Sequence, residues 1–568
     1  MPYKTSRRTF VKGFAAGSIL GGLGLLGRPV WASAGHGQPA ELSGTEFDLY
    51  IGETQVNFTG HEKTALTING GVPGPLLRWR EGDTVTLRVR NRLTESTSIH
   101  WHGILLPANM DGVPGLSFEG IAPDGLYEYR FKIRQNGTYW YHSHSGLQEQ
   151  SGVYGPLVIE AREPEPFSYE RDYVVMLSDW TDEDPARVLG KLKKQSDYYN
   201  SHKRTVGDFI ADVGEKGWSA TTADRKMWAQ MRMDPTDLAD VSGDTYTYLL
   251  NGQTPDMNWT GLFKPGERIR LRFINGSAMS YFDVRIPGLK MTVVASDGLY
   301  VKPVSVDELR IAVAETFDVI VEPQAGAYTL FAQAMDRSGF ARGTLTSTLG
   351  TVAPIPPLDP RPLLGMGDMG HGQMNHGAAS MHGMDHDNRP MKMDGQSHPT
   401  SEHGNPLVDM QAMSTSPRLD DPGIGLRDNG RRVLTYSDLR STFDDPDGRE
   451  PGRTIELHLT GHMEKFAWSF DGVKFSDAEP LMLKYGERVR VVLVNDTMMT
   501  HPIHLHGMWS DLEDENGQFM VRKHTIDMPP GSRRSYRVTA DALGRWAYHC
   551  HLLYHMEMGM FREVRVEE

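Results

Sequence analysis

The residues best suited to chemistry lie near the carboxyl end of the chain, in the stretch HCHLLYHMEMGM at 549–560. It contains Cys550, the single cysteine among 568 residues. A lone cysteine forms no intramolecular disulfide, and many such residues are small buried hydrophobes. Here the thiol lies among imidazoles and thioethers, and a thiolate, two imidazoles and a weakly held methionine make up a blue-copper electron-transfer site. The stretch therefore predicts such a site at Cys550, His555 and Met560, completed by one histidine from elsewhere.

Two patterns that recur three times along the chain locate further histidines. In the first, a glycine and an acidic residue precede an alternating apolar strand that ends in asparagine, at 80–91, 264–275 and 484–495. The spacing indicates one strand in three copies. The residues nine and eleven positions beyond each asparagine are His100 and His102, Val284 and Ile286, and His504 and His506.

The second pattern repeats in the same way, in NGTYWYHSH, AGAYTLFAQ and LGRWAYHCH. The residues five and seven positions beyond its glycine are His142 and His144, Phe331 and Gln333, and His549 and His551. The first and third copies thus each supply four histidines from the two patterns, and the middle copy supplies none.

Strand geometry decides which way these side chains point. Residues i and i+2 of a strand face one side of the sheet and residue i+1 faces the other. Each H-x-H therefore presents two imidazoles together, and the pairs from the outer copies could surround a cluster of copper ions. Cys550, between His549 and His551, must point the opposite way and bind a separate copper. His501, in HPIHLHG, is free to complete that second site, and a few covalent bonds would link the two sites.

Several domains are needed to position these residues, because 568 residues exceed what one hydrophobic core supports. Sixty glycines and 34 prolines, with short segments rich in Val, Ile, Thr and Tyr between them, favour β-sandwich units over helical ones. We expect domains at 44–163, 170–350 and 431–568. The middle domain would carry an irregular insertion at about 185–240, and a linker at 351–430 would join it to the third domain.

The amino-terminal residues 1–34 are typical of a twin-arginine export signal. TSRRTFVK precedes a glycine-rich apolar run and small residues before a cleavage point after Ala34. The alternative is a basic tail with an anchor helix, which the shortness of the run disfavours. No later segment has the apolar length of a membrane span, so we expect a periplasmic protein without stable membrane insertion. Removal of the five cations of the leader changes the formal net charge from −14 to −19, which disfavours nucleic acid as a partner.

HWHG at 100–103, HSH at 142–144, HPIHLHG at 501–507 and HCHLLYHMEMGM at 549–560 occur in this order and resemble the four copper-binding motifs of the multicopper oxidases. The resemblance covers nearly the whole mature chain. It implies an all-β protein of three cupredoxin-like Greek-key domains, each a β-sandwich or barrel, in tandem. It also implies four copper ions: one type 1 ion that takes electrons from substrate, and one type 2 and two type 3 ions that reduce O2 to water.

The resemblance also implies a role for each ligand by motif position. The type 1 ion would be held by His501, Cys550, His555 and Met560, and the type 2 ion by His100 and His504. The two type 3 ions would be held by His102, His142 and His551, and by His144, His506 and His549. The catalytic set would be Cys550, His549 and His551 for electron transfer, with Asp111 as an acid that assists proton delivery. For Asp111, in NMDGVPG, an ordinary Asp-Gly turn is the alternative.

Residues 366–413 differ sharply in composition from the rest, with nine methionines, six histidines and few large apolar residues. Such a composition predicts a flexible, solvated segment. Thioethers and imidazoles suit Cu(I), so additional copper capture is favoured over a neutral spacer. The candidate ligands for substrate Cu(I) are Met366, Met369, Met374, Met381, Met384, Met556 and Met558. Met508 and Asp511, beside the type 1 motifs, are further candidates, and packing or surface roles are the alternatives for all of these.

With this leader and this segment, the chain is similar to the periplasmic copper-resistance protein A group of the family. The first hypothesis is an enzyme that oxidises Cu(I) to Cu(II) with four-electron reduction of O2. The second is a periplasmic protein that sequesters copper, and the third is a laccase-like phenol oxidase. Cu(I) and O2 are the expected partners of a monomer, and other periplasmic copper-handling proteins are candidate partners.

Overall fold

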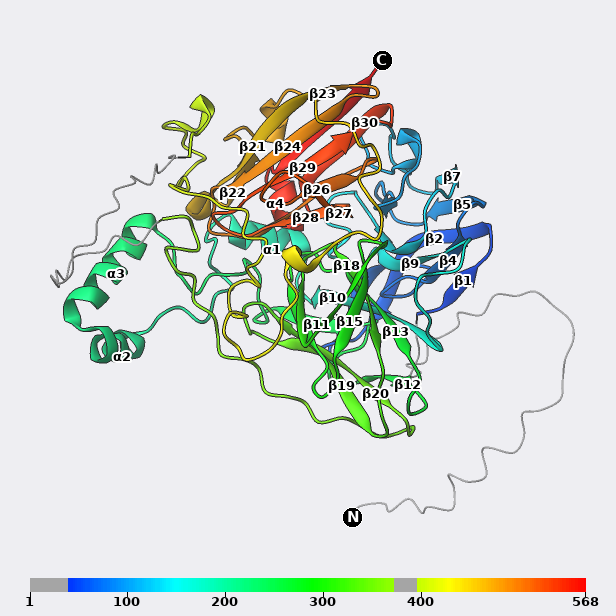
Figure 1. Ribbon diagram of the computed structural model, residues 1–568, viewed down its shortest axis with the longest axis horizontal. Helices are drawn as coiled ribbons and strands as arrows, with labels where there is room; N and C mark the ends of the chain where they lie inside the picture. The colour runs from blue at the N-terminus through cyan, green and yellow to red at the C-terminus, as the bar shows by residue number, and fades with distance from the viewer. Residues whose placement is uncertain (1–38, 372–395) are drawn as a thin grey trace, which may run out of the picture. The chain divides into compact units, whose positions relative to one another are not determined.

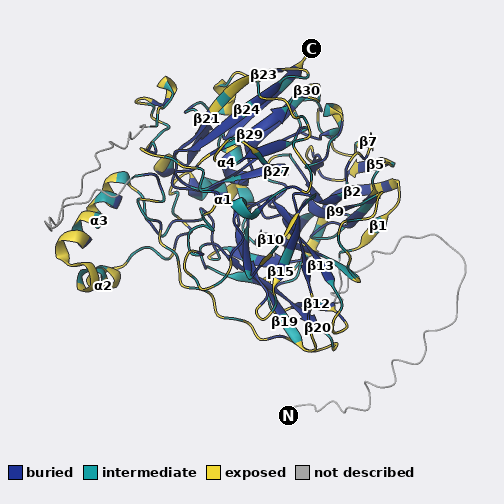
Figure 2. Cartoon of the chain, in the orientation of Figure 1, coloured by how far each residue is buried: buried dark blue, intermediate teal, exposed yellow. Residues whose placement is uncertain are grey.

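The computed structural model describes residues 39–371 and 396–568, and these residues form three groups of β-strands (Figure 1). Each group consists of two sheets, so the predicted all-β fold of three tandem domains is confirmed. Strands that are distant in sequence are neighbours within each sheet, as in a Greek key. One cluster of buried apolar side chains includes members from all three groups, among them Trp101, Phe273 and Trp546. Figure 2 shows the strands mainly in the colour of buried residues.

The first domain has a sheet of five strands and a sheet of four. The larger sheet has the order β1 (Glu41–Ser43), β4 (Leu76–Arg80), β9 (Tyr154–Glu160), β8 (Gly137–His142) and β6 (His100–His102). The smaller sheet has the order β3 (Lys63–Ile68), β2 (Glu46–Val56), β5 (Thr84–Asn91) and β7 (Leu126–Lys132). The two H-x-H segments of this domain belong to the larger sheet, where His100 pairs with His142.

The middle domain has sheets of six and five strands. The larger has the order β11 (Tyr246–Leu250), β10 (Arg171–Thr181), β13 (Ile269–Asn275), β18 (Thr316–Val321), β15 (Met291–Ser296) and β16 (Leu299–Val306). The smaller has the order β12 (Trp259–Leu262), β20 (Phe340–Thr346), β19 (Ala327–Ala334), β14 (Phe282–Arg285) and β17 (Glu308–Ile311).

The third domain repeats this plan with sheets of six and five strands. The larger has the order β22 (Ala467–Phe470), β21 (Arg453–His462), β24 (Arg488–Asn495), β29 (Arg533–Thr539), β26 (Ser510–Glu513) and β27 (Phe519–Lys523). The smaller has the order β23 (Leu481–Lys484), β31 (Phe561–Glu567), β30 (Gly544–Cys550), β25 (His501–Leu505) and β28 (Thr525–Met528). The short helix α4 (Leu553–Glu557) follows β30 and carries His555.

The asparagine that ends the repeated strand makes the same hydrogen bonds in all three domains. The side-chain amide donates to two backbone carbonyls: Glu95 and Ile121 for Asn91, Ser280 and Ile311 for Asn275, and Met499 and Met528 for Asn495. In each case the side-chain oxygen also accepts from the backbone N–H two residues further on. The repeat predicted from the sequence is therefore confirmed down to individual hydrogen bonds.

The glycine of the second pattern also has one conformation in all three copies. Gly137, Gly326 and Gly544 have φ values of 122°, 128° and 130°, a region that L side chains rarely adopt. The outer copies share a strand register, in which His100 pairs with His142 and His504 with His549. In the middle copy Val284 pairs with Ala332 rather than with the expected Phe331, so its register differs by one residue.

The insertion of the middle domain is helical, so the prediction of an irregular segment is wrong. It contains α1 (Pro185–Leu192), α2 (Val206–Lys216) and α3 (Trp218–Met231). Local signals explain the start of two helices: Asp184 accepts from two backbone N–H groups before α1, and Thr205 forms a capping box with Asp208 before α2. Figure 2 shows α2 and α3 largely exposed, and a helical insertion does not change the all-β class of the three domains.

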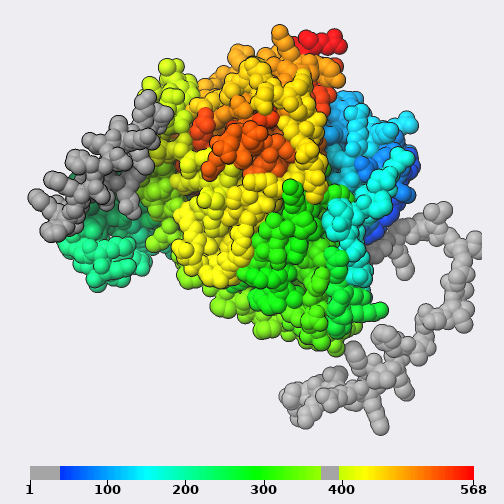
Figure 3. All heavy atoms as spheres, in the orientation of Figure 1, coloured from blue at the N-terminus to red at the C-terminus, as the bar shows by residue number. Residues whose placement is uncertain are grey.

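Many residues in the described parts of the predicted linker at 351–430 are exposed or half-buried, but others belong to the core. Leu364, Met369, Leu419 and Leu426 are buried in these parts. The chain after residue 400, yellow in Figure 3, lies across the green middle domain and the orange third domain. Single β-bridges join it to both, as at Glu308–Val433 and Ser416–Ser532.

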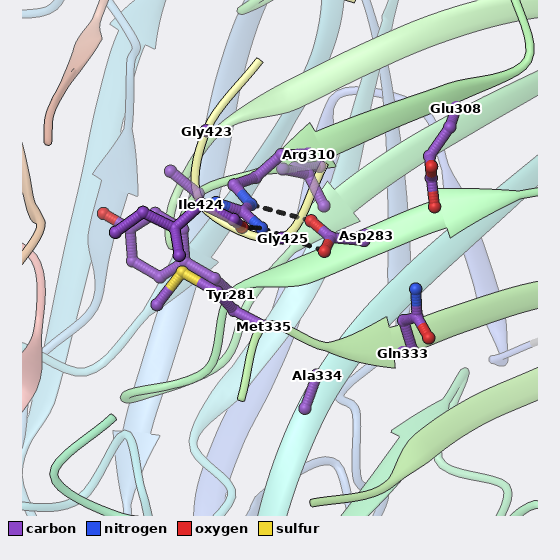
Figure 4. A network of polar contacts seen from close by, with 12 residues as sticks. Tyr281, Asp283, Glu308, Arg310, Gln333, Ala334, Met335, Gly423, Ile424 and Gly425 are labelled. Carbon is purple, nitrogen blue, oxygen red and sulfur yellow. Dashed lines mark hydrogen bonds and ion pairs between the residues drawn. The ribbon is translucent and has the colours of Figure 1, made fainter. Parts of the chain in front are cut away.

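An ion pair of the middle domain holds the end of this connection (Figure 4). Arg310 makes two hydrogen bonds to Asp283, of 2.7 and 2.9 Å, and a third of 2.8 Å to the carbonyl oxygen of Ile424. Arg337 donates to Asp283 and to the carbonyl oxygen of Gly425. The connecting chain is thus fixed by charged side chains that a reading of its own composition could not reveal.

Candidate metal centre

The predicted type 1 ligands meet at the end of β30. The sulfur of Cys550 lies 3.5 Å from Nδ1 of His501 and 3.8 Å from Nδ1 of His555, and these two nitrogens are 3.1 Å apart. Met560 is buried and adjacent to them. Its backbone carbonyl accepts from the N–H of Cys550, and its backbone N–H donates to the carbonyl of His555, both at 3.1 Å. All four side chains are fully buried. The structure therefore brings together the residues that the sequence predicted.

The outward nitrogen of each type 1 histidine has a protein partner. Nε2 of His501 lies 2.7 Å from the hydroxyl of Thr497, and Nε2 of His555 lies 2.8 Å from Oδ2 of Asp240. Trp468 stacks on the His555 ring with centroids 3.9 Å apart. These contacts fix both rings with Nδ1 towards the thiol, which is how outer partners orient metal-ligating histidines.

The eight histidines of the four H-x-H segments lie together between the first and third domains, on β6, β8, β25 and β30 or directly after them. Nε2 of His549 is 3.3 Å from Nε2 of His144 and 3.0 Å from Nε2 of His506. The rings of His102 and His142 lie 4.9 and 5.0 Å from that of His551. Both predicted type 3 sets therefore converge, and the rings of the type 2 pair, His100 and His504, are 5.8 Å apart.

The chemistry of these donors fits copper. Buried ring nitrogens without a hydrogen-bond partner occur in His100, His102, His142, His504 and His551. An unpaired buried nitrogen costs about 1–3 kcal/mol, which a bound metal ion would offset. Burial lowers the pKa of most of these imidazoles, to about 4 for His549, and so keeps them in the neutral form that binds metals. Burial raises the pKa of the Cys550 thiol, so its thiolate needs a cation beside it.

Asp111 contacts two of the predicted copper ligands. Nδ1 of His506 donates to its carboxylate at 2.8 Å, and Nδ1 of His100 donates to its backbone carbonyl at 2.8 Å. Asp111 also belongs to an Asp-Gly turn, since Gly112 has a φ of 80° and a Cβ there would lie 1.9 Å from the carbonyl oxygen of Ile99. The turn thus brings the acid to the histidines, and its part in proton delivery stays a prediction.

Sequence reasoning missed three residues at these centres: Asp240, Glu149 and His524. A carboxylate oxygen of Glu149 lies 2.6 Å from Nδ1 of His142, and burial raises the pKa of this acid well above its ordinary value. The carbonyl of His524 accepts from Nδ1 of His504 at 2.6 Å, and its ring lies 4.8 Å from that of His102. None of the three belongs to an H-x-H segment, so no spacing signal marks them.

The candidate ligands for substrate Cu(I) differ in how deeply the structure buries them. Met369, 0% exposed, belongs to the core, and Met366, Met556 and Met558 pack against it. Met508 is also buried, and Asp511 forms an ion pair with Arg522 at 2.6 Å, so Asp511 is no free metal ligand. Met374, Met381 and Met384 lie outside the described residues. Of these candidates, Met369, Met508 and Asp511 are therefore buried in the fold, and Met366, Met556 and Met558 are half-buried.

Other methionines occur at the type 1 site instead. A small cavity beside it is lined by Asp240, Met279, Met335 and Met499, together with Asp336 and with apolar and hydroxyl side chains. Asp240 connects this cavity to the type 1 set, because the same carboxylate bonds to His555. Thioethers and a carboxylate thus lie next to a residue predicted to receive electrons.

Models of the multicopper oxidase family match residues 50–164, 171–351 and 448–568. A copper resistance protein A homolog of Pseudomonas syringae pv. tomato is 80% identical over the whole of both chains, and copper resistance protein A of Escherichia coli is 69% identical over the whole of both.

Two solved structures show the same fold at low sequence identity. Fet3p, a multicopper oxidase that functions in iron import, has a TM-score of 0.64 at 18% identity and covers 92% of this chain and 90% of its own. The laccase from Botrytis aclada has a TM-score of 0.61 at 20% identity and covers 93% and 88%. The family models and the relatives that match over the whole chain agree with the geometry of the histidines and the thiol. The chain therefore belongs to the multicopper oxidase family.

Proposed function

We propose that this chain is a periplasmic oxidase of copper resistance that oxidises Cu(I) to Cu(II). In the balanced reaction, four Cu(I), one O2 and four protons give four Cu(II) and two water molecules. The names of the highly identical relatives support the role in copper resistance. Across residues 39–371 and 396–568, no helix has both the length and the apolar character needed to cross a membrane. The twin-arginine leader that supports export lies outside these residues.

The methionine-lined cavity at the type 1 site is the observation that supports Cu(I) as the electron donor. Thioethers prefer Cu(I), and a carboxylate prefers the harder Cu(II). Met279, Met335 and Met499 would therefore bind the substrate ion, and Asp240 would favour its oxidised form. Asp240 also contacts His555 directly, which gives a short path for the electron. The smallness of the cavity is unfavourable for a phenol, which needs an open pocket.

We infer four resident copper ions, held as the motifs imply, which would supply one-electron steps between the donor and O2. The residues of the chain have separate tasks around them. Thr497 and Asp240 orient the two type 1 imidazoles. The backbone of β30 joins Cys550 to His549 and His551 on the opposite face. Asp111 holds His506 and His100, and is the proposed proton donor to the oxygen site.

The test is O2 consumption by the copper-loaded protein with Cu(I), Fe(II) and a phenol, measured side by side. Met499→Leu removes a thioether at similar volume, so we expect a higher KM for Cu(I) with the blue colour retained. Met482→Leu, at a methionine that is 45% exposed and lies outside the methionine-rich segment, is the matched control and should change nothing. Equal Cu(I) kinetics in all three proteins, with faster turnover of the phenol, would favour a laccase-like oxidase.

A further inference from the structure

A second group of potential metal ligands lies on the third domain and the connecting chain, outside the copper motifs. His458 is on β21, and Asp496 directly follows β24. His398 and Glu402 come from the connecting chain, Glu402 from a short 3-10 helix at Thr400–Glu402. One possible ligand atom from each of the four residues lies within 4.8 Å of all the others. Donors about 2.0–2.2 Å from one ion have separations of this order or less.

The charges of this cluster are not balanced by lysine or arginine. The side chains of Glu402 and Asp496 are 0% exposed. In the part of the chain that the structure describes, their ion-pair partners are only His398 and His458. A comparable pair, Asp297 and Glu315, has the ammonium group of Lys523 3.0 and 3.1 Å away. Buried charges are normally paired or bound to metal, so a cation is expected at the cluster too.

The orientation of the His398 ring also indicates a cation at the cluster. Its Nε2 donates to the carbonyl of Ala412 at 3.1 Å, which leaves a lone pair on Nδ1. Nδ1 lies 3.3 Å from Asp496 and 3.4 Å from Glu402, yet no hydrogen bond is formed there. A lone pair that faces two carboxylates is unfavourable unless a cation or a proton lies between them.

Outer hydrogen bonds hold the two acids in place. Gln411 donates to Oε2 of Glu402 at 2.8 Å, and the backbone N–H of Ala412 donates to Oδ1 of Asp496 at 2.9 Å. Oε1 of Glu402 is buried and accepts no hydrogen bond. Glu402 therefore has one oxygen fixed by Gln411, whereas both oxygens of Asp496 have partners, because Nδ1 of His458 lies 2.6 Å from Oδ2. The unpaired Oε1 of Glu402 faces the histidines, 3.6 Å from Nδ1 of His458. Ligands of metal sites are usually held by outer partners of this kind.

We propose that His398, Glu402, His458 and Asp496 form an additional metal site for a divalent transition cation, with Cu(II) as the ion that fits it best. Two imidazoles and two carboxylates lack the soft sulfur donors that Cu(I) prefers, and Cu(II) is bound most tightly among the divalent first-row ions. The existence of the site is independent of the proposed function. Only the choice of Cu(II) rests on it, because Cu(II) is the product of the proposed reaction.

The position of the site connects it to the electron-entry centre. Asp496 is followed by Thr497, whose hydroxyl lies 2.7 Å from Nε2 of His501. The additional ion would therefore be held one loop away from the predicted type 1 ligands, beside the segment that contributes Met499 to the methionine-lined cavity.

The test counts Cu(II) bound by the holoenzyme after exchange into a buffer with a weak chelator. His398→Ala and Glu402→Gln should each lose one equivalent relative to the wild type. His403→Ala removes an exposed histidine five residues away and should lose none. In the electron paramagnetic resonance spectrum, the Cu(II) signal that the wild type has and the first two variants lack should show nitrogen couplings from two imidazoles. The blue absorbance of each variant reports whether the third domain is folded.

Equal Cu(II) content and affinity in the wild type, His398→Ala, Glu402→Gln and His403→Ala would overturn the proposal. If Zn(II) displaced the additional Cu(II) when both ions were present at equal concentrations, the site would stand but the choice of Cu(II) would be overturned. O2 consumption with Cu(I), measured on the same samples, tests the proposed function separately. A wild type that binds the extra ion but does not oxidise Cu(I) would refute that function and leave the site intact.

Discussion

The two nitrogens of an imidazole have different tasks in this protein. In His506, Nδ1 donates to Asp111 and Nε2 points to Nε2 of His549. In His555, Nε2 bonds to Asp240 and Nδ1 points to Cys550. The partner of one nitrogen fixes the tautomer and so decides which nitrogen is free for metal. The hydrogen-bond partner of each imidazole therefore determines which ring nitrogen can bind a metal ion.

Cys550→Ser should abolish the blue colour of the holoprotein. The colour comes from charge transfer between thiolate sulfur and copper, and serine has no comparable donor. His549 and His551 point to the opposite face of β30 from Cys550, so copper held by the predicted type 2 and type 3 ligands should remain. Visible absorbance and copper content per protein measure the two effects. A Cys550→Ser variant that stays blue would disprove the type 1 assignment.

Asp111→Asn should slow O2 reduction about 10- to 100-fold, the usual effect of removing an outer partner of a metal ligand. The amide still accepts from His506 but supplies neither charge nor proton. Reduction of the blue site by substrate should keep its rate, because Asp111 touches none of those ligands. Stopped-flow absorbance separates the two steps. Asp124→Asn, in an exposed Asp-Gly turn, is the control, and equal rates in both variants would contradict the role.

Local spacing explains which site residues could be predicted. The H-x-H pairs, Cys550 and Met560 are defined by their distances along the sequence, and the structure places each of them at a centre. Asp240 is 315 residues from its partner His555 and comes from another domain. Glu149 and His524 likewise have no spacing that distinguishes them from other polar residues. Contacts of this kind depend on how domains pack, which a single sequence does not encode locally.

At the scale of single elements, the asparagines that end the repeated strands, Asn91, Asn275 and Asn495, support the strands independently of copper. Asn275→Ala should lower the free energy of unfolding by on the order of 3 kcal/mol, because Ser277 N, Ser280 O and Ile311 O lose a buried partner. Copper content should not change, since the middle copy has no copper ligand of its own. Asn516→Ala, at an exposed turn, should stay within about 0.5 kcal/mol. Calorimetry gives the comparison.

Asp283 tests how the connecting chain is held. Burial alone would raise the pKa of this carboxyl, but Arg310 and Arg337 outweigh burial and lower the pKa below its ordinary value of 3.8. The ionised Asp283 carboxylate therefore stabilises the fold fully above the ordinary pKa of 3.8. This stabilisation is lost as the pH falls through the lower pKa of the folded state. At pH 7, Asp283→Asn should cost about 3–5 kcal/mol, because two buried guanidinium groups lose their partner.

The measurement is the thermal midpoint of both proteins at pH 7 and near pH 3, and the difference should narrow in acid. Asp307→Asn breaks a more exposed pair with Lys290 and should cost at most about 1 kcal/mol. A constant difference between wild type and Asp283→Asn at both pH values would contradict this account.

The errors of the sequence analysis at this scale have a common cause. The Gly, Ser, Asp and Pro content of the connecting chain predicts solvated chain, and the insertion shows no alternating strand pattern. Their helices depend on caps such as Thr205 with Asp208, and their burial depends on docking against other domains. Alternating strands, in contrast, carry their pattern locally, and the repeated strands were predicted in the right places.

At the scale of the whole molecule, catalysis and copper capture should be separable. Replacing residues 374–394 with a Gly/Ser chain of equal length should preserve the blue colour and the turnover at saturating Cu(I), because no predicted type 1, 2 or 3 ligand lies there. Oxidation at low Cu(I) should weaken if thioethers of this segment deliver the ion. Rates against buffered Cu(I) measure this. Unchanged rates at every concentration, with copper tolerance lost in cells, would make sequestration the main function.

The middle domain touches both centres although it supplies no predicted copper ligand. Its Asp240 bonds to His555 at the type 1 site. Its Asp297 accepts from the backbone N–H of His524 and pairs with Lys523, beside the histidine cluster. The domain therefore acts as a support for the ligands of its neighbours rather than as a spacer between them.

The asparagines that end the repeated strands have a further meaning when the three domains are compared as copies of one unit. After duplication, a position is retained only where some task still requires it. The middle copy has kept the asparagine and the positive-φ glycine but has valine, isoleucine, phenylalanine and glutamine where its sisters have histidines. The features that shape the fold therefore occur in this chain both with and without the histidines predicted to bind copper, so the shape of the unit does not depend on those histidines.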